Sequence, residues 1–342
     1  MTTPAAVIFG CEGLRLTDWE RGFFREAQPQ GFILFARNVE EPEQVRRLTA
    51  EMRESVGRTA PVLVDQEGGR VQRLRPPHWS ALPPAAQLAE AGEEAIRIAA
   101  ALTAAELLDV GIDVNCAPCL DLLRPEGHGI IGDRAFGAAP ATVAACGRTY
   151  WETLLAGGVM PVIKHLPGHG RARVDSHKSL PEVETDLETL DHSDFSPFAE
   201  NRDCPWGMTA HVVFRACDPH HPVTLSPTAV AEIIRGRLRF DGVLVSDDLS
   251  MGALGGSMQE RTRMALAAGC DLALHCNGKR DEMIAVAEGG RPLDGPAERR
   301  LAAAEARRGR PDKVDRQALK DRLAALLTEA AAAPQAAAGV GI

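Results

Sequence analysis

Two residues in a glycine-rich stretch have the types and spacing for proton transfer. Asp175 and His177 end the segment Lys164-His-Leu-Pro-Gly-His-Gly-Arg-Ala-Arg-Val-Asp-Ser-His177. A histidine titrates near neutral pH, and a neighbouring carboxylate can orient its ring and stabilise its charged form. A glycine-rich loop cannot pack a core, but it can carry such a group to a substrate. The spacing predicts a proton-transfer pair, although an ordinary solvated loop could contain the same two residues.

Adjacent aspartates follow another apolar segment. Asp247 and Asp248 come directly after Val243-Leu-Val-Ser246. An aspartate at the end of a strand, directed into a pocket, can act as a nucleophile or a general base. The alternative is that one of them caps a helix beginning near Leu249. We expect one role for each residue.

Further polar residues follow most of the apolar segments and suit a polar ligand. The hydroxyl groups of a sugar need paired donors and acceptors, which acidic and basic side chains at a pocket mouth provide. Each of these residues alone is more often part of a structural ion pair. Together they predict a substrate-binding set: Asp65, Arg73, Arg134, Lys164, His165 and His211.

Eight short apolar segments that alternate with helical patterns must position these residues. Most are continuously apolar, which is typical of strands buried on both faces. The predicted strands are 5–11, 31–36, 61–65, 111–117, 159–165, 205–213, 242–247 and 270–276. The predicted helices are 41–56, 85–110, 141–157, 186–201, 227–239, 258–268 and 281–288.

This alternation predicts an α/β fold, a single (β/α)8 TIM-type barrel over residues 1–290. Residues 291–342 are expected to form a C-terminal helical extension, with a linker at 291–296, helices at 297–308 and 314–331, and a disordered tail. A doubly wound open sheet is the alternative. It is disfavoured because no G-x-G-x-x-G follows the first strand and no Walker loop occurs.

Composition indicates a small-molecule or uncharged-polymer substrate. The net charge of -9 provides no basic surface for nucleic acid or anionic lipid. We see neither a secretion signal nor a membrane span, and the eight scattered cysteines resemble reduced core thiols. We therefore expect a cytoplasmic protein, a monomer, with no nucleic-acid or membrane partner.

A metal site is a further possibility, because several histidines lie near carboxylates. The candidate ligands are His165, His169, Asp175, His177 and His211. Their spacing does not form H-E-x-x-H, and a glycine-rich loop would hold ligands poorly. A metal-dependent hydrolase stays open, but we expect neither metal nor cofactor.

The motifs together resemble glycoside hydrolase family 3, and within it the bacterial cytoplasmic β-N-acetylhexosaminidases of cell-wall recycling. The resemblance rests on the Lys164–His177 segment and on Ser246-Asp-Asp-Leu-Ser-Met251. Five other motifs occur in the family's order: Leu34-Phe-Ala-Arg-Asn38, Val64-Asp-Gln-Glu-Gly-Gly-Arg-Val-Gln-Arg73, Asn115-Cys-Ala-Pro118, Ile131-Gly-Asp-Arg134 and Met208-Thr-Ala-His211. They extend over residues 30–280.

The resemblance implies retaining hydrolysis of terminal β-linked N-acetylglucosamine, with anhydro-muropeptides as natural substrates. It assigns Asp247 as nucleophile, His177 as acid/base and Asp175 as its assistant, with sugar-binding roles for the polar set above. A substrate-assisted mechanism would need an adjacent Asp-Glu pair, and Asp281-Glu282 is expected at the surface. A non-catalytic sugar-binding barrel and a broader β-glycosidase compete with this function.

Overall fold

Eight parallel strands form a closed barrel in the computed structural model, which describes residues 3–311 and 313–333. The order around the barrel is β1, β12, β11, β9, β7, β6, β3, β2, and then β1 again. The barrel strands are β1 (Ala5–Phe9), β2 (Pro29–Leu34), β3 (Val62–Val64), β6 (Val114–Asn115), β7 (Met160–Leu166), β9 (Trp206–Thr209), β11 (Val243–Asp248) and β12 (Leu272–His275). Each lies within or overlaps one of the eight predicted segments.

Closure of the sheet confirms the predicted α/β barrel. Strand β1 pairs in parallel with both β2 and β12, so the sheet has no free edge, and an open doubly wound sheet is excluded. Every residue of β7 is buried, including two polar ones. Burial on both faces explains why the strands are continuous apolar segments in the sequence.

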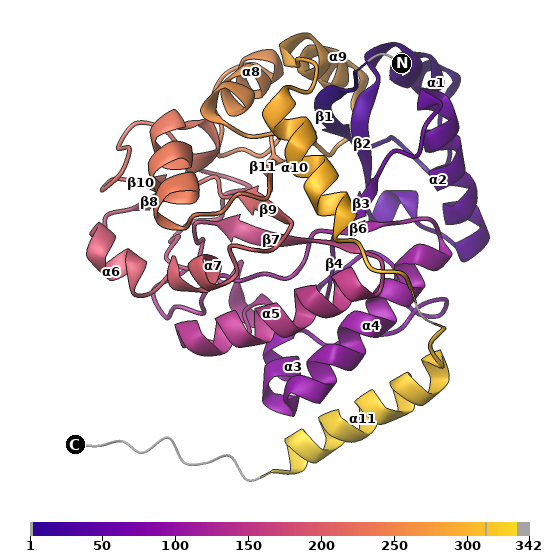
Figure 1. Ribbon diagram of the computed structural model, residues 1–342, viewed down its shortest axis with the longest axis vertical. Coiled ribbons are helices and arrows are strands. Elements are labelled where there is room, and N and C mark those ends of the chain that lie inside the picture. The colour runs from indigo at the N-terminus through magenta and orange to yellow at the C-terminus, as the bar shows by residue number, and fades with distance from the viewer. Residues whose placement is uncertain (1–2, 312, 334–342) are drawn as a thin grey trace.

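Helices surround the barrel and return the chain to the start of each next strand (Figure 1). They are α1 (Asp18–Ala27), α2 (Pro42–Val56), α3 (Ala85–Ala91), α4 (Glu93–Asp109), α5 (Pro140–Ala156), α6 (Leu187–Asp191), α7 (Ser196–Glu200), α8 (Met258–Ala268) and α9 (Arg280–Gly289). A π-helical segment, η4 (Ala229–Arg237), precedes β11, and short 3-10 turns occur at η1 (Ala36–Asn38), η2 (Gly132–Arg134) and η3 (Val223–Leu225).

The helix predictions needed correction at several points. Helix α1 was missed, although Thr17 and Glu20 form a capping box that marks its start. The predicted helix 85–110 is divided at Gly92, whose φ of 93° and ψ of 178° are not helical. The predicted helix 186–201 is also two helices, and Pro197 near the start of the second cannot donate a helical hydrogen bond.

The C-terminal extension packs on the barrel rather than extending from it. Helix α10 (Gly295–Ala306) crosses one end of the barrel (Figure 1), while α11 (Arg316–Ala332) lies along α3 and α4. The predicted linker 291–296 is wrong in part, because Gly295 and Pro296 belong to α10. The rest of it pairs with the start of β1: the Ala6 N–H donates to the Arg291 carbonyl at 2.8 Å. Most of the predicted disordered tail, residues 334–342, lies outside the described residues.

Two small strand pairs lie outside the barrel. Strands β4 (Gln66–Gly68) and β5 (Val71–Gln72) form an antiparallel hairpin directly after β3. Strands β8 (Glu182–Val183) and β10 (Val213–Phe214) pair in parallel and join the segment after β7 to the segment after β9.

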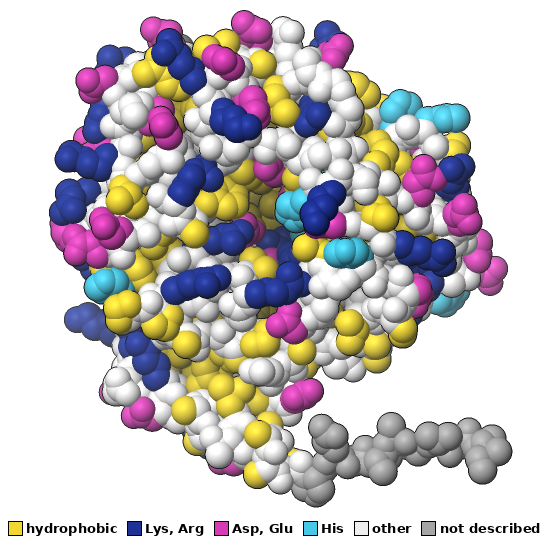
Figure 2. All heavy atoms as spheres, turned by 180° about the vertical axis from the view of Figure 1, so that it is seen from behind, with side chains coloured by type: hydrophobic (Ala, Val, Ile, Leu, Met, Phe, Trp, Pro, Cys, Tyr) yellow, Lys and Arg dark blue, Asp and Glu magenta, His cyan; other side chains and the backbone are white. Residues whose placement is uncertain are grey.

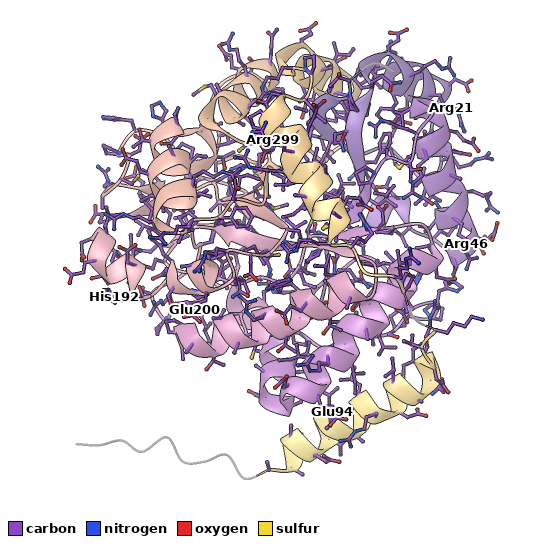
Figure 3. All side chains as sticks on the ribbon, viewed as in Figure 1. Arg21, Arg46, Glu94, His192, Glu200 and Arg299 are labelled. Atoms are coloured by element: carbon purple, nitrogen blue, oxygen red, sulfur yellow. The ribbon has the colours of Figure 1, made fainter. Side chains whose placement is uncertain are left out.

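Charged and histidine side chains lie on the outer helices. Figure 3 labels examples that lie on or beside α1, α2, α4, α6, α7 and α10: Arg21, Arg46, Glu94, His192, Glu200 and Arg299. Among the residues that the structure describes, no helix is both long enough and apolar enough to span a bilayer.

Asp271, which is 4% exposed, fixes α10 and η4 to the starts of β11 and β12. Its carboxylate accepts hydrogen bonds from Arg300 at 2.9 Å, Arg235 at 3.1 Å and the Leu244 N–H at 2.9 Å. We expect Asp271→Ala to lower the free energy of unfolding by about 3–5 kcal/mol, because it removes the buried carboxylate that Arg235 and Arg300 share. Urea unfolding at pH 7 measures this loss.

The matched control is Glu54→Ala, at an exposed acidic residue of α2. It should change the free energy of unfolding by no more than about 0.5 kcal/mol. Equal effects of the two substitutions would contradict this account of how α10 is held.

Candidate active site

A cavity of about 270 Å³ opens at the carboxyl ends of the barrel strands. Figure 2 shows it as a hollow near the centre of the face opposite α10, with basic, acidic and histidine side chains gathered around it. Active sites of such barrels occur at this end. Seven of the nine predicted site residues line the cavity: Asp65, Arg73, Arg134, Lys164, His165, His177 and Asp247.

A buried lysine lies at the centre of the cavity's polar wall. The Lys164 side chain is 2% exposed, and its Nζ contacts an Asp65 oxygen at 2.7 Å and a Glu67 oxygen at 2.6 Å. Arg73 contacts the other Asp65 oxygen at 3.1 Å. Arg134 binds both Glu67 oxygens at 2.8 Å in a bidentate pair. Two carboxylates and three cations thus form one network.

This network keeps all its members charged. Burial alone would raise the pKa of Glu67, but Arg134 and Lys164 outweigh it and lower the pKa to about 2. Burial would likewise raise the pKa of Asp65, and Lys164 and Arg73 lower it well below its usual range. The two carboxylates in turn raise the pKa of Lys164 despite its burial. At neutral pH the cavity wall presents fixed charges to a ligand.

The β4–β5 hairpin places Arg73 and Glu67 at the cavity. The Gln66 side chain accepts the Arg73 N–H at 2.9 Å and the Leu74 N–H at 3.1 Å, which closes the hairpin. Asn115 of β6 holds the Gln66 backbone through two hydrogen bonds of 3.0 Å. The Arg73 guanidinium also lies 5.2 Å from the centre of the Phe35 ring, which lines the same cavity.

A buried aspartate orients His165. Asp121 is fully buried, and its Oδ2 lies 2.6 Å from His165 Nδ1. Its Oδ1 accepts the His169 N–H at 2.6 Å. Burial would raise the pKa of Asp121, but His165 lowers it well below the ordinary value. Since Nδ1 is engaged, Nε2 is the nitrogen of His165 left to contact a ligand.

The two adjacent aspartates at the end of β11 differ in environment. Burial would raise the pKa of Asp247, but His211 and His165 lower it, so this carboxylate in the cavity wall is ionised at neutral pH. Asp248 shapes the turn that follows: its Oδ1 accepts the Ser250 N–H at 3.0 Å and its Oδ2 accepts the Ser250 hydroxyl at 2.6 Å. The expected helix near Leu249 is wrong, because this segment forms turns and α8 begins at Met258.

His211 lies beneath the cavity and does not line it. The ring is fully buried, and its Nδ1 lies 2.7 Å from the Thr224 hydroxyl. Its Nε2–H donates to the Asp248 carbonyl at 2.9 Å. Burial lowers the pKa of His211. Both ring nitrogens have protein partners, so the structure does not support direct substrate contact, and His211 instead holds the Asp248 carbonyl.

Asp175 and His177 form the predicted pair on the loop after β7. The Asp175 Oδ1 lies 2.9 Å from His177 Nδ1 and accepts the His177 N–H at 2.9 Å. The imidazole is 61% exposed and lines the cavity, whereas Asp175 does not line it. Burial would raise the pKa of Asp175, but its hydrogen bonds to His177 lower it. A charged carboxylate therefore orients an exposed imidazole.

Glu67 and Asp121 were absent from the predicted set, although each binds a predicted residue of the site. Glu67 lies in the same stretch as Asp65, and its place two residues after a strand-end aspartate was an available signal. Asp121 follows the fourth barrel strand, but its role depends on contact with His165, 44 residues away in sequence. That contact exists only in the folded chain.

One group of potential metal ligands occurs among the described residues. Oxygen, nitrogen and sulfur atoms of Cys119, Asp121 and His165 lie within 4.8 Å of one another. They already contact each other, with Cys119 Sγ 3.3 Å from Asp121 Oδ2. Burial raises the pKa of the Cys119 thiol well above its ordinary value, which opposes the thiolate that a metal prefers. This group differs from the metal ligands predicted from the sequence and shares only His165 with them.

Comparison with known proteins identifies the family. Residues 15–306 match the glycosyl hydrolase family 3 N-terminal domain. The chain belongs to this family. It is 40% identical over 280 residues to a β-hexosaminidase of Pseudomonas aeruginosa, covering 80% of this chain and 83% of that protein. It is 39% identical over 321 residues to a β-hexosaminidase of Methylococcus capsulatus, covering 91% and 94%.

A solved structure of a relative has the same fold. NagZ from Neisseria gonorrhoeae, crystallised with N-trifluoroacetyl-D-glucosamine, superimposes with a TM-score of 0.84 at 31% identity, covering 95% of this chain and 98% of that one. These matches confirm the predicted family. They also bear out the predicted enzyme class, a glycoside hydrolase of the β-N-acetylhexosaminidase type.

The charge of Glu67 makes stability depend on pH. Its folded-state pKa of about 2 lies below the unfolded value, so its ionised form stabilises the fold above the unfolded pKa. That contribution is lost as the pH falls through about 2. The stability difference between the wild type and Glu67→Gln should shrink by up to about 3 kcal/mol between pH 7 and the lowest pH at which both variants fold.

Urea unfolding over this pH range measures the difference. Glu54→Gln, at an exposed position of α2, serves as the control and should show no comparable change. A difference between wild type and Glu67→Gln that stays constant over the range would contradict the linkage.

Proposed function

We propose that this enzyme removes terminal β-linked N-acetylglucosamine with retention of configuration, using Asp247 as nucleophile and His177 as acid/base. The observation that carries the proposal is one cavity walled by both an ionised Asp247 and the imidazole of the Asp175–His177 pair. Cleavage of a glycoside needs a nucleophile at the anomeric carbon and a proton donor at the leaving oxygen.

The first step forms a covalent glycosyl-enzyme. Asp247 attacks the anomeric carbon, and the imidazolium of His177 gives its proton to the departing oxygen. Asp175 accepts from Nδ1, so Nε2 is the nitrogen that faces the substrate. The Asp175 carboxylate lies 2.9 Å from Nδ1 and so holds the ring in place for the step.

The second step releases the sugar. The now neutral His177 takes a proton from water as that water attacks the anomeric carbon, and Asp247 leaves as carboxylate. Because His211 lowers the pKa of Asp247, the carboxylate is a stable leaving group as well as an available nucleophile. Because His177 is exposed, water can replace the departed aglycone beside its imidazole.

The charged network suits the hydroxyl groups of the sugar. Asp65 and Glu67 can accept hydrogen bonds, while Lys164, Arg73 and Arg134 can donate them. The network does not require an anionic sugar, because its two carboxylates offset two of its three cations. The relative crystallised with N-trifluoroacetyl-D-glucosamine supports a sugar with a 2-acylamino group.

We include anhydro-muropeptides of cell-wall recycling as natural substrates in the proposal, with action in the cytoplasm. The support is the family resemblance and the relatives named NagZ and β-hexosaminidase. The cysteines add support, since all eight are free and six of them are buried.

Sugar choice and the role of Asp247 are tested together. The wild type should release p-nitrophenol from the β-N-acetylglucosaminide much faster than from the β-glucoside, with and without EDTA. Asp247→Ala should lower kcat by at least about 10³-fold. Asp281→Ala, at an exposed acidic residue of α9, is the control and should retain activity.

Each competing function has its own outcome in this assay. Loss with EDTA would favour a metal-dependent hydrolase, and equal use of both sugars would favour a broader β-glycosidase. Full activity of Asp247→Ala would remove the nucleophile assignment. Loss in Asp281→Ala would favour substrate assistance, and no activity at all would favour a sugar-binding protein.

The acid/base role of His177 predicts dependence on the leaving group. Nitrophenolate leaves with little help from a proton, whereas methoxide does not. His177→Ala should therefore lower kcat/KM for the methyl β-N-acetylglucosaminide by about 10²–10⁴-fold, and far less for the nitrophenyl one. Exposed His192 provides the control variant His192→Ala. Equal losses on both glycosides would refute the assignment.

A further inference from the structure

The turn after β11 contacts the loop that carries the Asp175–His177 pair. The Gly252 N–H donates to the His177 carbonyl at 3.1 Å, and the Ala253 N–H donates to the Ser176 carbonyl at 3.1 Å. These two hydrogen bonds join the segment that follows Asp247 directly to the backbone of the predicted acid/base.

The two segments lie so close together at Gly252 that a side chain would not fit between them. A Cβ built on Gly252 would lie 2.8 Å from the His177 oxygen and 3.1 Å from the Lys178 oxygen. Real Cβ atoms essentially never lie as close as 2.8 Å to a backbone oxygen, so even an alanine would push the two segments apart. The φ of Gly252 is outside the left-handed region, so the glycine is required by the contact and not by its own backbone.

The base of the same turn is fixed by Asp248. In addition to its bonds to Ser250, its carbonyl accepts the Met251 N–H at 3.1 Å, and its Oδ1 accepts the Cys276 N–H at 3.1 Å. His211 holds this carbonyl from below at 2.9 Å. The turn that contacts the loop is therefore anchored at the residue next to Asp247.

The loop has a second attachment on its other side. The Ser176 hydroxyl lies 3.0 Å from His169 Nε2, and His169 is 4% exposed. Beyond the pair, the Lys178 and Ser179 N–H groups donate to the Asp175 carbonyl at 2.9 and 3.0 Å, which closes a tight turn around His177. With Ser176 held by His169, the contact with Gly252 determines how the His177 backbone faces the cavity.

We propose that Gly252 is a positioning residue that docks the acid/base loop on the turn after the nucleophile. The role rests on the proposed function. It makes the position of His177 depend on the segment that carries Asp247, so that the proton donor and the nucleophile share one support.

The test compares Gly252→Ala with Gly255→Ala on two glycosides. Gly255 lies in the same segment and a Cβ there would meet nothing within 4 Å, so it is a matched control. Gly252→Ala should lower kcat/KM for the methyl β-N-acetylglucosaminide by at least about 10-fold, part of the full contribution of a general acid. The nitrophenyl glycoside should change by less than about 3-fold, and Gly255→Ala should change neither.

Dependence on the leaving group separates positioning from general damage. Provided that the wild type is active, one outcome would refute the positioning role alone. In that outcome the ratio of kcat/KM for the two glycosides is the same in Gly252→Ala as in the wild type. A wild type inactive on both glycosides would refute the proposed function itself.

Hydrogen exchange in the wild type provides a second measurement that needs no variant. The Gly252 and Ala253 amides should exchange slowly, whereas the Gly255 amide, which donates to no protein group among the described residues, should exchange fast. Fast exchange at Gly252 and Ala253 would overturn the docking contact even if Gly252→Ala failed to fold.

Discussion

The site depends on keeping one lysine charged inside the barrel. Lys164 is almost fully buried, and an isolated ammonium group there would lose its proton or destabilise the fold. Asp65 and Glu67 prevent both outcomes, and they in turn require Arg73 and Arg134. The cavity wall is therefore a set of mutually dependent charges, preorganised before a sugar arrives.

The barrel supplies this set because parallel strands all end at the same side. Residues distant in sequence, such as Asp65 after β3, Lys164 in β7 and Asp247 in β11, meet there without any local motif joining them. The other end of the barrel has a structural role, in which α10 is held by Asp271 through Arg300. One end of the fold is thus available for chemistry while the other contributes stability.

The proposed mechanism divides the chemistry between a rigid and an exposed part. Asp247 belongs to a barrel strand and has a lowered pKa, whereas His177 is carried by a loop and is largely exposed. A group that must first give a proton and then take one benefits from access to water. Precision then has to come from contacts of the loop: Gly252 bonds its backbone on one side, and His169 contacts the Ser176 hydroxyl on the other.

The sequence by itself determined the strands, the barrel and many residues that line the candidate site, because continuous apolar segments and the polar residues that follow them are local patterns. The Asp175–His177 pair was likewise visible, since its members are two residues apart. Only the tertiary structure decided which side chains of the site contact one another. His211 bonds to Asp248 beneath the cavity, Asp121 orients His165, and Glu67 joins Lys164 to Arg134. These roles depend on distances between strands, which no local pattern encodes, and the break at Gly92 depends on a backbone angle that a run of helix-forming residues conceals.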